Sequence, residues 1–167
     1  MDKEAVQPAG AAGNEAETKD GGGEVKIYIA SSWKNGQLAV DLAHFLREVG
    51  HEVDCFCETR PGRYTFDARE LPGHEELNAK TALKRPEFQK AFEQDKAMLD
   101  WCEAVVMVLP CGKSAHLEAG YAKGRGKHLY IWGKMPTGEW DVMYGFADGL
   151  FGHGELSKLL GALRGGG

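Results

Sequence analysis

The sequence lacks several features that would assign it to a familiar class. None of its 167 residues lie in a run approaching the roughly 18 apolar residues of a membrane-spanning helix. Its first residues also lack the apolar centre of a secretory signal. The four cysteines show no C-x-x-C spacing, and the chain contains no Gly-rich phosphate loop. These absences predict a cytoplasmic protein with reduced thiols and no membrane partner.

An excess of basic side chains, the usual mark of a nucleic-acid-binding protein, is also missing. Lys and Arg together number 20 against 25 Asp and Glu, for a formal net charge of −5. Residues 1–24 hold six of the acids and two lysines, so this segment carries −4 and the remainder of the chain −1. We therefore expect no nucleic-acid partner.

The composition divides the chain into a tail and one domain. Residues 1–24 are rich in Ala, Gly and Glu and end in three consecutive glycines before Glu24. Such a segment buries too little apolar surface to offset the entropy of ordering, so a disordered tail is predicted. Residues 25–164 have the length of one α/β domain with a core of its own.

Strand-like and helix-like patterns alternate through the domain. Residues 25–31 and 104–110 are short, rich in β-branched residues and bounded by turns, as expected of strands buried on both faces. Residues 51–57 and 127–133 show the same pattern more weakly. Helical spacing of apolar residues predicts a helix ending at Gly50, a second over 87–101 and a last one near the C-terminus. The apolar positions are Leu38, Leu42, Phe45, Leu46 and Val49; Phe88, Phe92, Leu99 and Cys102; and Leu156, Leu159, Leu160 and Leu163.

This alternation predicts a flavodoxin- or Rossmann-like fold. The expected sheet is doubly wound and mostly parallel, with four to five strands and helices on both faces. Ligands of such sheets bind beyond the carboxyl ends of the strands. The connection over 57–85 carries six basic residues and few large apolar ones, which predicts a functional or mobile loop without clear structure of its own.

Glu118 stands in the stretch SAHLEAGYA, on a helix expected from about Ser114 to Lys123. Its neighbours three and four positions away are Ser114, Ala115, Tyr121 and Ala122, a small and semi-apolar stripe. A carboxylate in that setting needs a partner or a function. The alternative is an acid that interacts with the helix dipole, worth about 0.3–1 kcal/mol.

Asp95 is a second carboxylate in an unexpected place. It occupies a position on the apolar stripe of the helix over 87–101, between Phe92 and Leu99. Acids are seldom buried without a partner, so Asp95 either has a role in a site or lies where the core face ends early. Two carboxylates at the mouth of a sheet suit chemistry at the anomeric carbon of a sugar, with one as the nucleophile.

Four segments together span most of residues 25–150: KIYIASSW, FEQDKAMLDWCEAVVMVLP, HLEAGYAKGRGK and DVMYGFAD. In their order and spacing they resemble the nucleoside 2-deoxyribosyltransferase family, which includes nucleotide N-glycosidases. The resemblance implies that Glu118 is the nucleophile, that Asp95 contacts the base and that Tyr28 steadies Glu118. It also implies that Asp141 and Met143 complete the pocket of a neighbouring subunit, and hence at least a homodimer.

The segment before Glu118 departs from that family. Gly112 stands where the nucleoside-specific enzymes have an Asp that grips the sugar and the nucleotide-hydrolysing relatives have a Ser that binds phosphate. Lys113 and Ser114 follow at an expected helix N-terminus, where a phosphate can bind. The remaining residues predicted to contact a ligand are Ser31, Ser32, Trp33, Lys34 and His116, although His116 is also explained as an ordinary surface histidine.

The predicted function is cleavage or transfer of an N-glycosidic bond of a nucleoside or nucleotide. The alternatives are a TIR-like NAD glycohydrolase and a non-catalytic module that binds a nucleotide. Neither a cofactor nor a metal is expected; a zinc site from Cys55, Cys57, Cys111 and His116 is the weaker alternative. The base, the acceptor and the need for a phosphate stay open.

Overall fold

A computed structural model describes residues 23–166. The predicted tail, residues 1–24, therefore lies almost wholly outside the described residues and stays a prediction. Among the described residues, no helix combines the length and the apolarity needed to cross a membrane.

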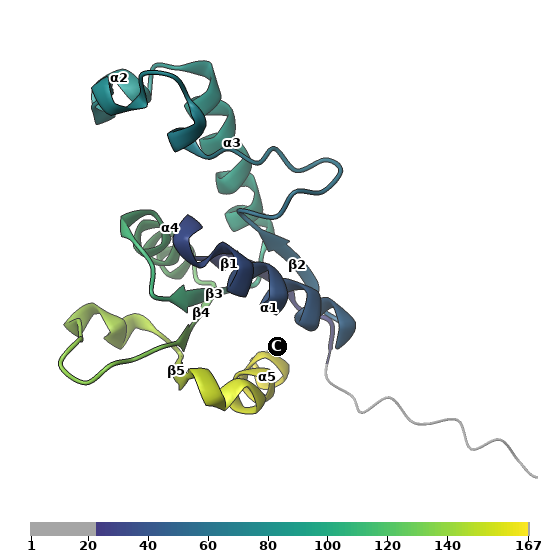
Figure 1. The fold of residues 1–167 in the computed structure, drawn as a ribbon. Coiled ribbons are helices and arrows are strands. Elements are labelled where there is room, and N and C mark those ends of the chain that lie inside the picture. The colour runs from purple at the N-terminus through teal and green to yellow at the C-terminus, as the bar shows by residue number, and fades with distance from the viewer. Residues whose placement is uncertain (1–22, 167) are drawn as a thin grey trace, which may run out of the picture.

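The centre of the molecule is a five-stranded sheet in which every neighbouring pair is parallel. The strand order is β2-β1-β3-β4-β5 (Figure 1). The strands are β1 (Lys26–Ala30), β2 (Glu52–Cys55), β3 (Ala104–Leu109), β4 (His128–Gly133) and β5 (Gly149–Gly152). The predicted doubly wound α/β fold is confirmed, and each of the four strand-like segments contains a strand.

Helices cover both faces of this sheet (Figure 1). The helices are α1 (Gly36–Glu48), α2 (Ala79–Ala82), α3 (Pro86–Trp101), α4 (Lys113–Gly124) and α5 (Leu156–Gly165). α1 and α5 pack against one face, and α3 and α4 pack against the other. Gly50 follows α1 with φ +99°, a left-handed conformation that explains why the helix stops there.

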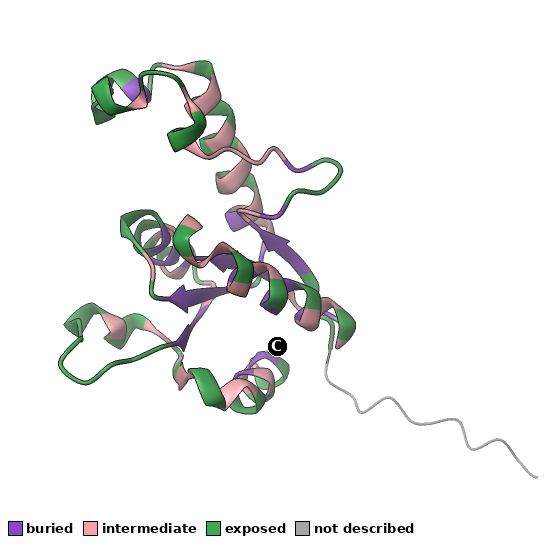
Figure 2. Ribbon diagram, viewed as in Figure 1, coloured by how far each residue is buried: buried purple, intermediate pink, exposed green. Residues whose placement is uncertain are grey.

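The core consists of two layers because successive residues of a strand point to opposite faces. Ile27 and Ile29 of β1 pack in the layer under α1 and α5, whereas Tyr28 and Ala30 pack in the layer under α3 and α4. All six residues of β3 are buried, as expected for a central parallel strand (Figure 2). The alternation along β1 therefore places Tyr28 on the face that carries α4.

Two sequence-based expectations were wrong. Phe92 was expected on the core face of α3, but it is 61% exposed. The N-terminal part of α3 extends past the sheet (Figure 1), and only the C-terminal part of this helix contributes to the two core layers. The segment over 57–85 was expected to lack structure, yet it contains α2 and the 3-10 helices Ala68–Glu70 and His74–Glu76.

Candidate active site

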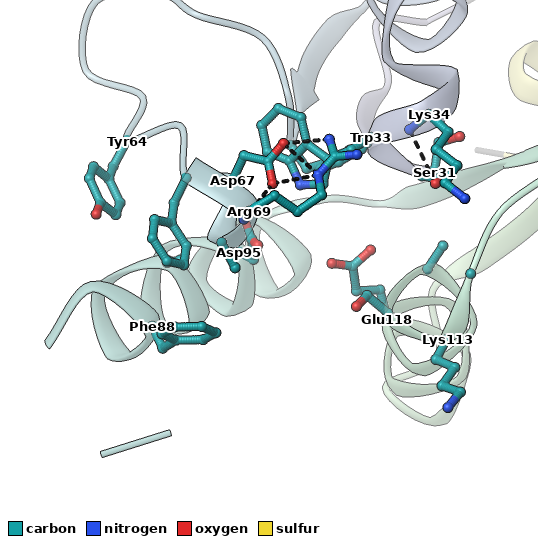
Figure 3. Close-up of a pocket in the computed structure, with 18 residues that line it drawn as sticks. Ser31, Trp33, Lys34, Tyr64, Asp67, Arg69, Phe88, Asp95, Lys113 and Glu118 are labelled. Atoms are coloured by element: carbon teal, nitrogen blue, oxygen red, sulfur yellow. Dashed lines mark hydrogen bonds and ion pairs between the residues drawn. The ribbon is translucent and has the colours of Figure 1, made fainter. Parts of the chain in front are cut away.

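A cavity of about 470 Å³ opens beyond the carboxyl ends of β1 and β3 (Figure 3). Its wall is made by the loop after β1, the segment after β2, one face of α3 and the first turns of α4. The lining residues are Ser31, Ser32, Trp33, Lys34, Phe56, Tyr64, Phe66, Asp67, Ala68, Arg69, Phe88, Ala91, Asp95, Gly112, Lys113, Ser114, Ala115 and Glu118. The cavity thus lies where the sheet topology predicts a ligand.

Glu118 projects into this cavity from the second turn of α4 (Figure 3). The hydroxyl of Tyr28, which is fully buried in β1, donates a hydrogen bond of 3.2 Å to Glu118 Oε1. Because Glu118 is the sixth residue of α4, it lies beyond the first turn, where the helix dipole acts most strongly on a carboxylate. An interaction with the dipole alone therefore explains its position poorly.

The environment of Glu118 favours the protonated carboxyl. Burial, followed by the negative charge of Asp95, raises the pKa of Glu118 to about 8. The hydrogen bond from Tyr28 and the positive charge of Arg63 oppose this shift of the pKa. Burial also raises the pKa of Tyr28 well above its ordinary value, so the Tyr28 hydroxyl remains a donor at neutral pH.

Asp95 lines the cavity from α3 and has a buried partner. The Arg63 guanidinium lies 2.8 Å from Asp95 Oδ1 and 3.3 Å from Asp54 Oδ2. The Arg63 side chain is only 2% exposed. Burial raises the pKa of Asp95, and the charge and hydrogen bond of Arg63 offset part of that shift. The ion pair with Arg63 thus explains how Asp95 can occupy a position on the apolar stripe of α3.

Sequence reasoning missed the pair formed by Arg63 and Asp54. Asp54 lies within β2 and is 1% exposed, and Arg60 Nη2 donates a 2.6 Å hydrogen bond to its Oδ1. One signal was present in the sequence, since an acid in the middle of a strand-like apolar segment requires a partner. The arginines that follow over 60–63 were the nearest candidates.

The aromatic wall of the cavity was missed as well, except for Trp33. The rings of Tyr64 and Phe66 stack with centroids 6.0 Å apart, and Phe88 packs edge-on against Phe66 at 5.0 Å. Trp33 packs edge-on against Phe56 at 5.4 Å. Several aromatic rings that line one cavity suit a planar ligand, which gains from stacking as well as from burial. These residues come from three separate segments, so their assembly is invisible in the sequence.

The predicted polar ligand-binding residues around the cavity are only partly free to bind. Ser31 Oγ donates 2.9 Å to the carbonyl of Val108, and Ser32 Oγ accepts from Lys34 N and caps a 3-10 helix. Lys34, Gly112, Lys113 and Ser114 line the cavity and are exposed. Neither lysine ammonium forms an ion pair with any residue in the described part of the chain.

His116, Asp141 and Met143 lie away from Glu118. They line a separate hollow of about 810 Å³ between α4 and the 3-10 helix Val142–Phe146. The His116 ring stacks on Tyr144 at 5.9 Å, and Asp141 Oδ1 accepts a hydrogen bond from Met143 N. Within one chain, therefore, the structure does not bring these three predicted residues to the cavity.

The four residues considered as zinc ligands form two pairs. Cys55 Sγ lies 3.7 Å from Cys57 Sγ, and Cys111 Sγ lies 3.8 Å from His116 Nδ1. Over residues 23–166, no three side chains of the metal-binding types gather at one point. The four residues thus do not form the tetrahedral set that a structural zinc ion requires.

Comparisons with known proteins show similarity to solved structures but not to a family or a curated protein. No protein-family model matches the chain, and no curated protein matches it. The structure of the CMP N-glycosidase BcmB from Clostridium botulinum matches with a TM-score of 0.50 and 14% sequence identity. The match covers 81% of this chain and 97% of that one. At such low identity the likeness shows the doubly wound α/β fold and no more.

Proposed function

We propose that residues 25–164 form an N-glycosidic enzyme that acts on a nucleotide, with Glu118 as its nucleophile. The observation that carries the proposal is the Glu118 carboxyl, which lies in an aromatic-lined cavity, accepts a hydrogen bond from buried Tyr28 and shares the cavity with Asp95. The Clostridium enzyme of similar fold acts on CMP. That likeness supports the substrate class without assigning any residue.

In this reaction the ionised Glu118 carboxylate attacks the anomeric carbon of the sugar. The bond from that carbon to the base breaks, and its electron pair leaves with the base nitrogen. Asp95 contacts the base, and a proton from water neutralises the base as it departs. Water, or a second base, then releases the sugar from Glu118. The partial burial that raises the pKa of Glu118 also strengthens its attraction for the positive charge that develops on the sugar.

The residues around Glu118 take supporting roles in this proposal. Tyr28 holds the carboxyl oxygen that it contacts and leaves the other oxygen for the sugar. The aromatic side chains hold the planar base. Arg63 does not line the cavity, and it acts through Asp95 by keeping that side chain in place.

A phosphate is proposed to bind at the rim, near the start of α4. Lys113 and Ser114 stand in the first turn of this 12-residue helix, whose free backbone amides favour an anion. Lys34 provides a second exposed ammonium from the loop after β1. Figure 3 shows the Lys113 side chain directed away from Glu118, so contact with a phosphate requires rotation about its side-chain bonds.

A homodimer is part of the same proposal. Trp140, Val142, Met143 and Phe146 are 79%, 78%, 57% and 56% exposed, a cluster more apolar than a solvated loop needs. Burial of this cluster against a second copy accounts for its composition. Light scattering at high micromolar concentration should give the mass of a dimer or larger assembly, and a monomer mass would contradict this part.

The enzymatic proposal is tested by incubating the protein with nucleoside monophosphates, the matching nucleosides and NAD. Chromatography then measures the released base, with the Glu118→Gln variant as the control. The proposal expects base from one or more monophosphates and far less from the nucleosides. Release from NAD alone would favour an NAD glycohydrolase, and binding without any release would favour a nucleotide-binding module.

A further inference from the structure

Two cysteines beside the cavity lie in an arrangement that the proposed reaction does not use. Cys55 is the last residue of β2 and is fully buried, whereas Cys57 is partly exposed. A turn closed by a 3.2 Å hydrogen bond from Glu58 N to the Cys55 carbonyl joins them. This turn brings the two Sγ atoms to 3.7 Å from each other.

We propose that Cys55 and Cys57 form a redox-active dithiol, which a small-molecule disulfide converts into an intramolecular disulfide. The required movement is small. The sulfur atoms, now 3.7 Å apart, must approach to a bond length of about 2.05 Å, a change of about 1.7 Å. Cys57 also touches the carbonyl of Gly36 at 3.6 Å, a weak contact that does not hold the thiol away from Cys55.

The two thiols differ in a way that sets the order of the steps. The hydrogen bond from Cys55 lowers the pKa of Cys57, while that interaction and burial raise the pKa of Cys55. The thiolate of Cys57, being the more accessible, attacks oxidised glutathione and expels one glutathione thiolate. Cys55 then loses its proton and attacks Cys57 Sγ, which expels the second glutathione. Two protein thiols lose two electrons and two protons, and one glutathione disulfide becomes two glutathione thiols.

Closure of this disulfide would change the wall of the cavity. Phe56 is the residue between the two cysteines, and its ring packs edge-on against Trp33 at 5.4 Å. Both Phe56 and Trp33 line the cavity that contains Glu118. A shift of the turn therefore displaces an aromatic contact on which the shape of the cavity depends.

The test maps the thiols after treatment of the folded protein with oxidised glutathione. The chain has four cysteines, so alkylation followed by peptide mass spectrometry can distinguish them. Cys55 and Cys57 should both be protected from alkylation, in one peptide. Dithiothreitol should restore both thiols. The indole N–H resonance of Trp33, assigned with Trp33→Phe, should move between the reduced and oxidised proteins.

Three variants separate this mechanism from general oxidation. Cys55→Ala should accumulate glutathione on Cys57, because the second thiol is missing. In Cys57→Ser, Cys55 should stay a free thiol that is alkylated. Cys111→Ser is a matched control and should still form the disulfide between Cys55 and Cys57. Stable glutathione on Cys57 in the parent protein, oxidation at Cys111 alone, or four free thiols would each overturn the proposal. None of these readouts depends on the enzymatic activity.

Discussion

Replacing Glu118 by Gln should make the protein more stable near neutral pH. Glu118 has a pKa of about 8 in the folded protein, raised mainly by burial and then by the charge of Asp95. In the unfolded chain the same carboxyl regains its ordinary pKa of 4.5. Between these two values the folded state binds more protons than the unfolded state, so the stability of the parent protein falls as the pH rises.

The magnitude follows from the width of that window. Each pH unit within it costs about 1.4 kcal/mol of unfolding free energy, and the interval from 4.5 to about 8 sets an upper limit near 5 kcal/mol. Because Gln does not titrate, the free energy of unfolding of Glu118→Gln does not fall over this pH range. From pH 5.5 to 7.5 the variant should gain about 3 kcal/mol relative to the parent. Below pH 4.5 the two proteins should no longer diverge.

Urea unfolding followed by circular dichroism at half-unit steps from pH 5.5 to 8.5 measures this difference. Titrating groups far from Glu118 occur in both proteins and cancel in the comparison. Glu93→Gln, an exposed change on α3, is the control and should shift stability by less than about 0.5 kcal/mol at every pH. A difference between parent and Glu118→Gln that stays constant within about 0.5 kcal/mol would refute the raised pKa.

Four further predictions concern activity and packing. On whichever substrate is cleaved, Glu118→Gln should lower the turnover number by about 1,000-fold or more and change the ligand affinity little. Asp95→Asn should lower the turnover number less, and Tyr28→Phe least. Steady-state kinetics measures all three effects. The kcat/KM of the parent should rise with pH up to about 8, because the nucleophile must be ionised, and a profile already flat from pH 6 would contradict this. Arg63→Gln should lower the free energy of unfolding by about 3 kcal/mol, since it removes a buried guanidinium from half-buried Asp95 and leaves buried Asp54 with Arg60 alone. Lys113→Ala should weaken binding of a nucleoside monophosphate by about tenfold, measured by calorimetry, and leave nucleoside binding unchanged.

Matched surface variants serve as controls for the last two. Arg164→Gln removes an exposed guanidinium from α5 and should change stability by less than about 0.5 kcal/mol. Lys158→Ala removes an exposed ammonium from the same helix and should leave monophosphate binding unchanged. Equal effects of Lys113→Ala on nucleosides and monophosphates would argue against a phosphate at the rim.

Local patterns in the sequence determined much of the fold. β-branched runs located β1 and β3, helical spacing located α1 and α5, and their alternation predicted the doubly wound sheet. Such patterns work because a buried strand or an amphipathic helix must present apolar side chains at its own period. The same patterns do not predict β5, because this four-residue strand has a glycine at each end and only two apolar side chains.

The exposure of Phe92 depended on tertiary structure, because periodicity identifies a helical face but not the extent of the core that covers it.

The sequence also could not predict which residues surround the two carboxylates. Tyr28 and Glu118 form a hydrogen bond across 90 positions of the chain, and Arg63 reaches Asp95 across 32. The raised pKa of Glu118 comes from burial and from the charge of Asp95 on another helix. The sequence alone singled out both acids as unusual, but only folding could decide their partners, because charges act through space and not along the chain.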